Sequence, residues 1–179
     1  EQLGFVKRNA KYLLSLVNQL MDFRKAESDK IEIVRTKGNI LHYTDEILKP
    51  FEVFALERGV HIEKRYRMDS PEILFDHENM NKLMTNLLSN AIKFTPDGGN
   101  VCVYMALLSE KTTHEERLYI SVRDSGMGVD EDELDKIFNR FYQSKKNIKY
   151  PVYGQSSTGI GLYLCKRIVE MQGGTIYAK

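Results

Sequence analysis

The N-terminal stretch carries apolar residues at helical spacing. They follow one another in alternating steps of four and three, with two further residues widening the stripe: Val6, Ala10, Leu13, Leu16, Val17, Leu20 and Phe23. This spacing predicts a helix with one apolar face. Because polar residues 24–30 follow and the globular pattern begins only afterwards, we interpret it as one helix of a bundle between chains. The alternative is a single amphipathic helix lying on its own domain.

The remaining pattern predicts strands and helices that do not alternate strictly. Strands are expected at 30–34, 60–68, 71–76, 100–108 and 117–124, and helices at 43–59, 77–94, 130–141 and 159–174. Pro50 is expected to kink the first of these helices or to mark a shift in its first turns. A polar turn joins the last two strands and predicts an antiparallel hairpin. This mixture indicates an α+β fold, in which one sheet is covered on one face by helices.

Three segments stand outside this regular pattern. Residues 142–158 are polar, basic and without periodicity, which is typical of a functional or mobile loop rather than a connector. Residues 1–14 are in helical register without a capping signal, and residues 173–179 stop as a strand begins. We therefore expect the chain to be a fragment of a longer protein.

Composition narrows the class of partners. The 179 residues include 26 Lys plus Arg against 25 Asp plus Glu, a net charge of +1, which gives no long-range attraction for nucleic acid or an acidic membrane. Cys102 and Cys165 lie in separate apolar stretches and are expected to be buried, reduced thiols. No apolar run reaches the roughly 20 residues that cross a bilayer, so we expect a cytoplasmic chain without direct membrane contact.

Polar residues interrupt the otherwise packable helix at 77–94. Asn86 and Asn90 are four residues apart and Lys93 follows one turn later, so all three lie on one rim of the helix. Amide oxygens and an ammonium group suit Mg²⁺ together with a polyphosphate. Amides that face solvent would give the same pattern, and the helix alone does not decide between the two.

The stretch "DSGMG" follows an apolar strand. Asp124 therefore emerges at the strand end, and Gly126 and Gly128 let the backbone approach a ligand closely. A carboxylate there can accept a hydrogen bond from the exocyclic amine of a purine.

A calcium loop is the competing interpretation of this region. Asp124, Asp130 and Asp132 cluster, but glycines occupy two ligand positions and Val129 stands where the EF-hand glycine belongs. We reject it.

A second glycine-rich stretch, "STGIGL" at 157–162, opens the last helix. Backbone amides at a helix N-terminus form an anion site. The stretch is not a P-loop, because no Lys-Ser pair follows the last glycine, and not a dinucleotide fingerprint, because no strand precedes it.

The order and spacing of these pieces resemble one family. "NKLMTNLLSNAIKFT", "DSGMGV", "IFNRFYQ" and "STGIGLYLCKRIVEMQGGTI" resemble the N box, first glycine box, F box and second glycine box of the histidine kinase ATP-binding domain. The preceding "LLSLVNQLMDFRKAESDKIEI" resembles the second helix of the dimerisation domain. The resemblance implies part of a dimerisation bundle at 1–30 and, at 31–179, an ATP-binding domain of the GHKL superfamily with its last strands truncated. Its Bergerat fold is a two-layer sandwich of helices on a mixed sheet.

The resemblance also implies roles for single residues. Asn90 would ligate Mg²⁺, Asn86 would support the metal or the phosphates, Lys93 would contact phosphate and Phe94 would pack against the nucleotide. Asp124 would accept the adenine amine, with room for the ring at Gly126 and Gly128. An ATP lid would span 141–158. The remaining nucleotide contacts would come from Phe141, Thr158, Gly159, Gly161 and Leu162.

A histidine kinase moves the terminal phosphoryl group of ATP to a histidine on the first dimerisation helix, for relay to a response-regulator aspartate. That histidine is expected before Glu1. Four histidines are present, His42, His61, His77 and His114, and His77 is best interpreted as a helix-start residue and His114 as solvated. This chain is therefore expected to bind ATP without completing autophosphorylation alone.

Two rival functions are open. The first is a nucleotide-responsive or inactive interaction module of the same fold. The second is a gyrase-type or chaperone ATPase, in which an acidic residue usually activates water where Asn86 stands. The asparagine disfavours hydrolysis, and the dimerisation-like helix disfavours both a gyrase and a chaperone. Lys145, Lys146 and Lys149 could neutralise phosphates, but solvated side chains are the favoured interpretation.

Overall fold

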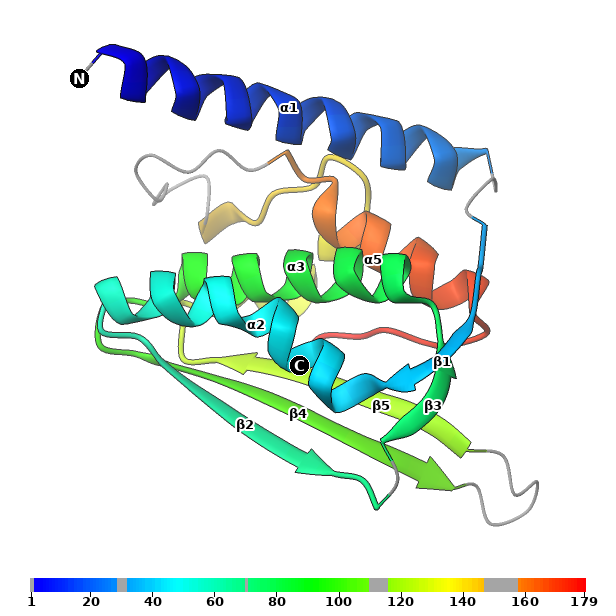
Figure 1. Cartoon of the computed structure of the whole chain (residues 1–179). Coiled ribbons are helices and arrows are strands. Elements are labelled where there is room, and N and C mark those ends of the chain that lie inside the picture. Colours follow the sequence, from blue (N-terminus) through cyan, green and yellow to red (C-terminus); the bar gives the residue numbers. More distant parts are fainter. Residues whose placement is uncertain (1, 29–31, 70, 110–115, 147–157) are drawn as a thin grey trace.

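Three of the helices form a layer over the larger sheet, and the N-terminal helix lies outside that layer (Figure 1). The computed structural model describes residues 2–28, 32–69, 71–109, 116–146 and 158–179 (Figure 1). The helices are α1 (Gln2–Glu27), α2 (Ile40–Glu57), α3 (His77–Phe94) and α5 (Gly161–Met171). The predicted helix at 77–94 is confirmed, and the predicted helix at 43–59 starts three residues earlier, at Ile40. Helix α2 continues through Pro50.

The strands form a mixed three-stranded sheet and a separate two-stranded one. In the first, β2 (His61–Arg67) runs parallel to β4 (Asn100–Ser109), which pairs antiparallel with β5 (Glu116–Asp124). In the second, β1 (Thr36–Asn39) pairs antiparallel with β3 (Glu72–Phe75). The α+β fold and the β4–β5 hairpin are confirmed. The expected single sheet is wrong for the described residues, which pair in two sheets.

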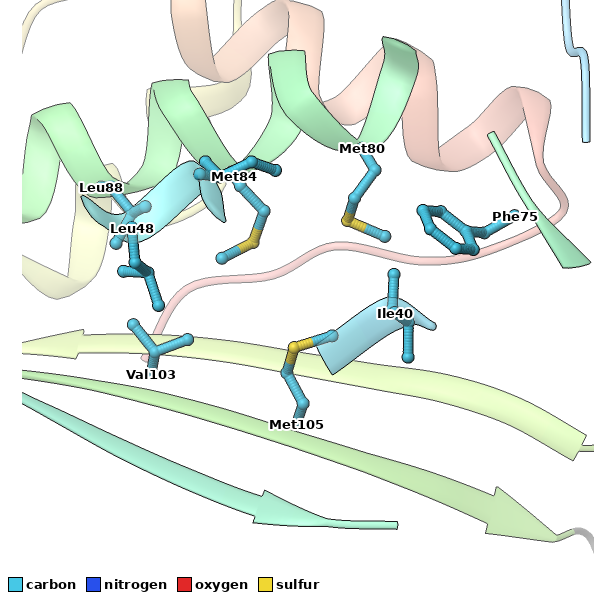
Figure 2. Close-up of a cluster of buried hydrophobic side chains, with 9 residues drawn as sticks. Ile40, Leu48, Phe75, Met80, Met84, Leu88, Val103 and Met105 are labelled. Carbon is cyan, nitrogen blue, oxygen red and sulfur yellow. The ribbon is translucent and has the colours of Figure 1, made fainter. Parts of the chain in front are cut away.

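The core lies between β4 and the helices α2 and α3. Val101, Val103 and Met105, at alternate positions of β4, are completely buried. Figure 2 shows Val103 and Met105 below Leu48, Met84 and Leu88. Full burial of each such side chain contributes about 1.5–3 kcal/mol. Cluster members from both helices and β3 complete this core: Ile40, Ile47, Phe75 and Met80.

The other face of the three-stranded sheet is less covered. Cys102, between two buried valines of β4, is only half-buried because strand side chains alternate between faces. The expectation that Cys102 is buried is therefore wrong. Cys165 on α5 is buried, and burial raises the pKa of its thiol to about 12.

The predicted strand at 30–34 is displaced along the chain. Residues 32–35 lie outside any ladder, and the Val34 amide donates to Asp76 Oδ2 at 2.7 Å. The strand forms instead at Thr36–Asn39, and Asn39 then caps α2 by accepting from the His42 amide at 2.9 Å. Residues 30 and 31 lie outside the described part of the chain.

The start of α3 is fixed by Asp76. This buried N-cap residue accepts from the Asn79 amide at 2.8 Å, as well as from Val34. Burial alone would raise the pKa of Asp76, but these amide donors outweigh it and lower the pKa. His77 follows as the first helical residue, and its Nδ1 lies 2.9 Å from Thr36 Oγ1. The helix-start interpretation of His77 is confirmed.

Two further expectations are wrong. Residues 130–141 form two short 3₁₀ turns, Glu131–Glu133 and Lys136–Phe138, instead of one helix. Residues 174–179 form no strand, because no ladder partner is bonded to them in the described structure.

Helix α1 lies on the side of the helix layer that faces away from the sheet (Figure 1). Its C-terminal half docks through Phe23, whose ring lies 5.5 Å from that of Tyr163 on α5, and through the buried Ala26. Lys82 of α3 donates to Asp22 at 2.8 Å. Five apolar residues nearer the N-terminus whose side chains the structure describes are 51–61% exposed: Leu13, Leu14, Val17, Leu20 and Met21. Most of the described part of this face is therefore uncovered by the chain itself.

No helix in the described ranges combines the length and the apolar character that a bilayer crossing needs.

We predict that Phe23→Ala releases α1 while leaving the sheet intact. Loss of the buried ring should cost about 3 kcal/mol. Amide hydrogen exchange should therefore speed up along α1 and remain slow in β4. Leu13→Ala is the matched control, since a side chain that is 61% exposed should change stability by less than about 0.5 kcal/mol. Equal effects of the two substitutions would contradict this docking.

Candidate functional site

Helix α3 carries three polar candidate residues along its C-terminal half: Asn86, Asn90 and Lys93. Asn86 and Asn90 are half-buried, and Lys93 is only 8% exposed. Burial lowers the pKa of Lys93, and its ammonium nitrogen lies 5.1 Å from the centroid of the Phe94 ring. The C-terminal half of the helix thus carries two amides, one desolvated cation and one aromatic ring.

Asn86 lies against the start of α5. Its Nδ2 donates to the Lys82 carbonyl at 2.8 Å, which satisfies the amide that otherwise weakens a helix interior. Its Oδ1 faces Gly161, where a Cβ atom would lie only 2.6 Å away. Glycine at the first residue of α5 therefore leaves room for the Asn86 amide in this orientation, and a larger residue there would make that side chain turn away.

The turn after β5 lies against the end of α3. Asp124 is exposed at the end of β5, and its Oδ1 accepts from the Gly126 amide at 2.9 Å. A Cβ atom at Gly126 would lie 2.5 Å from the Phe94 carbonyl oxygen, and Gly128 has a φ of +64°. Close packing explains the glycine at 126, and the positive φ explains the glycine at 128. The Asp124 carboxylate is thereby held near the end of α3.

The residues on either side of the polar loop meet each other. The Phe141 amide donates to the Gly159 carbonyl at 2.9 Å, and a Cβ atom at Gly159 would lie 2.6 Å from the backbone of Phe141. The Thr158 hydroxyl donates to Gln19 of α1 at 3.2 Å. Residues 147–157 lie outside the described structure, and with them Lys149 and most of the predicted lid.

One cavity of about 1680 Å³ gathers most of the predicted site. Eleven of the twelve residues named from the sequence line it: Asn86, Asn90, Lys93, Phe94, Asp124, Gly126, Gly128, Thr158, Gly159, Gly161 and Leu162. The cavity exceeds the roughly 300–1,000 Å³ of a typical ligand pocket because it continues along β5 and residues 173–179.

Phe141 is the residue that the structure does not bring into this lining. Its side chain is 60% exposed, and its ring lies 5.4 Å from Phe23 of α1. The expectation that it contacts a ligand of the cavity is therefore not supported in this arrangement, because its backbone follows a positive φ of 60° and its ring packs on α1.

Sequence reasoning missed an apolar wall of the cavity. Val129, Leu134, Ile137 and Phe138, from the turn after Asp124 and the two 3₁₀ turns, line it together with Tyr142. Their spacing in "GVDEDELDKIF" predicted a helix face, and the signal that could have identified them is their position directly after the glycine-rich turn.

Glu133 was also missed. It is completely buried, and its Oε1 accepts from the Tyr142 hydroxyl at 2.6 Å and from the Lys145 amide at 2.9 Å. The hydrogen bond from Tyr142 is the main reason that the pKa of Glu133 is lowered. The other oxygen, Oε2, has no hydrogen-bond partner in the described structure. In the sequence, Glu133 belongs to an acidic run that is typical of a solvated face.

The same acidic run binds two lysines of the polar loop. Lys145 lies 2.9 Å from Asp132 and Lys146 lies 3.0 Å from Asp130. The Lys145 side chain is 68% exposed, as expected for a solvated lysine, and the 3₁₀ turns bring an aspartate beside each of the two lysines.

Comparison with known proteins shows the family of this chain. The sequence profile described as "Histidine kinase-, DNA gyrase B-, and HSP90-like ATPase" matches residues 75–179. "Histidine kinase P4" of Formosa agariphila is 32% identical over 98% of this chain and 12% of that protein. "Sensor protein GacS" of Pseudomonas syringae pv. syringae is 31% identical over 98% of this chain and 19% of that protein. The chain thus spans less than a fifth of either relative.

A solved structure gives the same result for the fold. Full-length ShkA in complex with AMPPNP superposes with a TM-score of 0.76 at 26% sequence identity, over 95% of this chain and 33% of ShkA. The chain belongs to the histidine kinase-, DNA gyrase B- and HSP90-like ATPase family, with an ATP-binding domain of the sensor histidine kinase type.

Proposed function

We propose that this chain is the catalytic part of a sensor histidine kinase that binds Mg²⁺-ATP in the cavity beside α3. It would donate the terminal phosphoryl group to a histidine on a first dimerisation helix, for relay to a response-regulator aspartate. The observation that carries the proposal is the convergence of Asn86, Asn90, Lys93, Asp124 and the glycine-rich turns on one cavity.

The purine end of the nucleotide would lie at the turn after β5. The Asp124 carboxylate is an acceptor for an exocyclic amine, and the close packing of Gly126 on α3 keeps the turn in place. Val129, Leu134 and Ile137 supply an apolar wall on which a purine ring can pack.

The phosphate end would lie between Lys93 and the start of α5. Lys93 supplies positive charge from a desolvated position, where an ion pair is stronger than in water. Backbone amides at Gly159 and Gly161 lie at the N-terminal end of α5, where the helix dipole favours anions.

The donor set also fits Mg²⁺. The half-buried amide of Asn90 lines the cavity one turn before Lys93, and an amide oxygen is a ligand of the type that Mg²⁺ accepts alongside water and phosphate oxygens. A bound Mg²⁺ would neutralise phosphate charge during transfer. Asn86 carries a neutral amide that donates to the Lys82 carbonyl, so it cannot act as the base that a water-activating ATPase needs.

The division of the chain follows from the same proposal. Residues 1–30 would be the second helix of a dimerisation bundle, and residues 31–179 the ATP-binding domain. The uncovered apolar face of α1 supports this division, since a second copy of the helix pair would bury it.

We predict that ATP binding to this chain depends on Mg²⁺ and on Asn90. Calorimetric titration should show that Asn90→Ala weakens the affinity for Mg²⁺-ATP by about tenfold or more, because a metal ligand is lost. Asn81→Ala is the matched control, since Asn81 is an exposed asparagine of the same helix. A folded wild-type chain without affinity for ATP would contradict the kinase proposal and favour the interaction module.

We also predict that the affinity for ATP falls with rising pH through the titration of Lys93. Phosphate binds the charged form of the lysine. Burial lowers the pKa of Lys93 in the free chain, so this side chain loses its charge at a lower pH than an exposed lysine does. The decrease should approach about tenfold per pH unit above that pKa. Lys93→Arg, which stays charged, should show a flat profile from about pH 7.5 to about 9.5. The same slope in both proteins would exclude Lys93 as its source.

A further inference from the structure

One arginine from the end of α2 binds the last turn of α3. The Arg58 guanidinium donates from Nη1 to the Ile92 carbonyl at 2.7 Å, from Nη2 to the Thr95 carbonyl at 2.8 Å and from Nε to Asp97 Oδ1 at 2.9 Å. Its own carbonyl accepts from the Gly98 amide at 3.2 Å. The side chain is only 22% exposed, so these bonds form away from most of the solvent.

These bonds satisfy carbonyls that the end of a helix leaves without partners. Within this turn, the Ala91 carbonyl accepts from the amide and the hydroxyl of Thr95, at 3.1 and 2.6 Å. Arg58 binds the Ile92 carbonyl, and the Phe94 carbonyl lies against Gly126. A cation at this end also complements the helix dipole. Each of these three carbonyls is therefore contacted either by Thr95 or by a residue from another part of the chain.

The two carbonyls that Arg58 binds bracket the residues that face the cavity. Ile92 precedes Lys93, and Thr95 follows Phe94. A planar guanidinium holds two carbonyls with donors on different nitrogens in a fixed fork, whereas lysine carries its three donors on one nitrogen at the end of a flexible stem. Arg58 itself does not belong to the cavity lining in the described structure.

We propose that Arg58 is a positioning residue of the nucleotide site, which fixes the last turn of α3 and thereby the places of Lys93 and Phe94 in the cavity. The proposal rests on the proposed function for its nucleotide and on the geometry for its effect on Lys93. Asp97 is secondary, because its side chain is 77% exposed and an exposed ion pair contributes little.

The decisive substitution is Arg58→Lys, which keeps the charge and removes the fork. We expect the affinity for Mg²⁺-ATP, measured at a temperature where circular dichroism shows the variant folded, to fall about tenfold. The matched control is Arg65→Lys on β2, an arginine that is 62% exposed and paired with Glu63. It should bind Mg²⁺-ATP within about twofold of the wild type.

A second measurement needs no nucleotide. The pKa of the Lys93 ammonium, followed by NMR in the ligand-free chain, should move towards its ordinary value in Arg58→Lys as the side chain leaves its buried position. A merely structural role would lower the unfolding temperature and leave this pKa and the affinity of the folded protein unchanged. Arg58→Gln, which can still donate to one carbonyl, is the replacement if Arg58→Lys does not fold.

The two measurements distinguish a failure of the positioning role of Arg58 from a failure of the proposed function. An unchanged pKa of Lys93 in the folded variant overturns the positioning role, whatever happens to ATP. If the wild-type chain binds no ATP, the proposed function fails, and the Lys93 titration still decides whether Arg58 holds this lysine.

Discussion

The close approach of two backbone segments to α3 is the constraint on which the rest of the site depends. Gly126 lies against the Phe94 carbonyl and Gly161 against the Asn86 side chain, and a single added carbon at either position would lie within 2.6 Å of an existing atom. At Gly126 the clash would be with the backbone of α3, so it must be relieved by moving the turn after β5. At Gly161 it would be with the end of the Asn86 side chain, which would have to turn away from α5. Both segments carry candidate binding groups, so this packing fixes Asp124 and the α5 amides relative to Asn90 and Lys93.

The polar residues of α3 are compensated in different ways. Asn86 satisfies its Nδ2 with the Lys82 carbonyl, and Asp76 and Arg58 hold the two ends of the helix. Lys93 is different, because burial disfavours its charged form and lowers its pKa. A bound phosphate would reverse this effect by stabilising the charge. Helix α3 therefore packs along one side and, under the proposed function, would meet an anionic ligand along the other.

The sequence predicted the elements whose signals are local. The bounds of α3 follow from an apolar stripe between Asp76, a good N-cap residue, and the turn after Phe94, and the β4–β5 hairpin follows from two alternating strands around a polar turn. The strand expected at 30–34 failed because the Val34 amide bonds to Asp76, more than 40 residues away in the sequence. Local propensity carries no information on such a partner.

The same distinction applies to the site. Residues of the glycine-rich and asparagine-bearing motifs could be named because their spacing is visible in the sequence, and eleven of them line one cavity. Phe141 does not line the cavity, because its ring packs against that of Phe23, which is far away in the sequence. Glu133 and Arg58 could not be found, since an acidic run and a lone arginine after a helix are usually solvated. Their roles depend on Tyr142 and on the carbonyls of α3.

NMR titration of the wild-type chain with Mg²⁺ and a non-hydrolysable ATP analogue tests the central claim most directly. The account predicts saturable amide shifts at Asn90, Lys93, Gly126 and Gly161 together, because these residues line one cavity. Shifts confined to other parts of the chain, or none at saturating nucleotide, would contradict a nucleotide site beside α3.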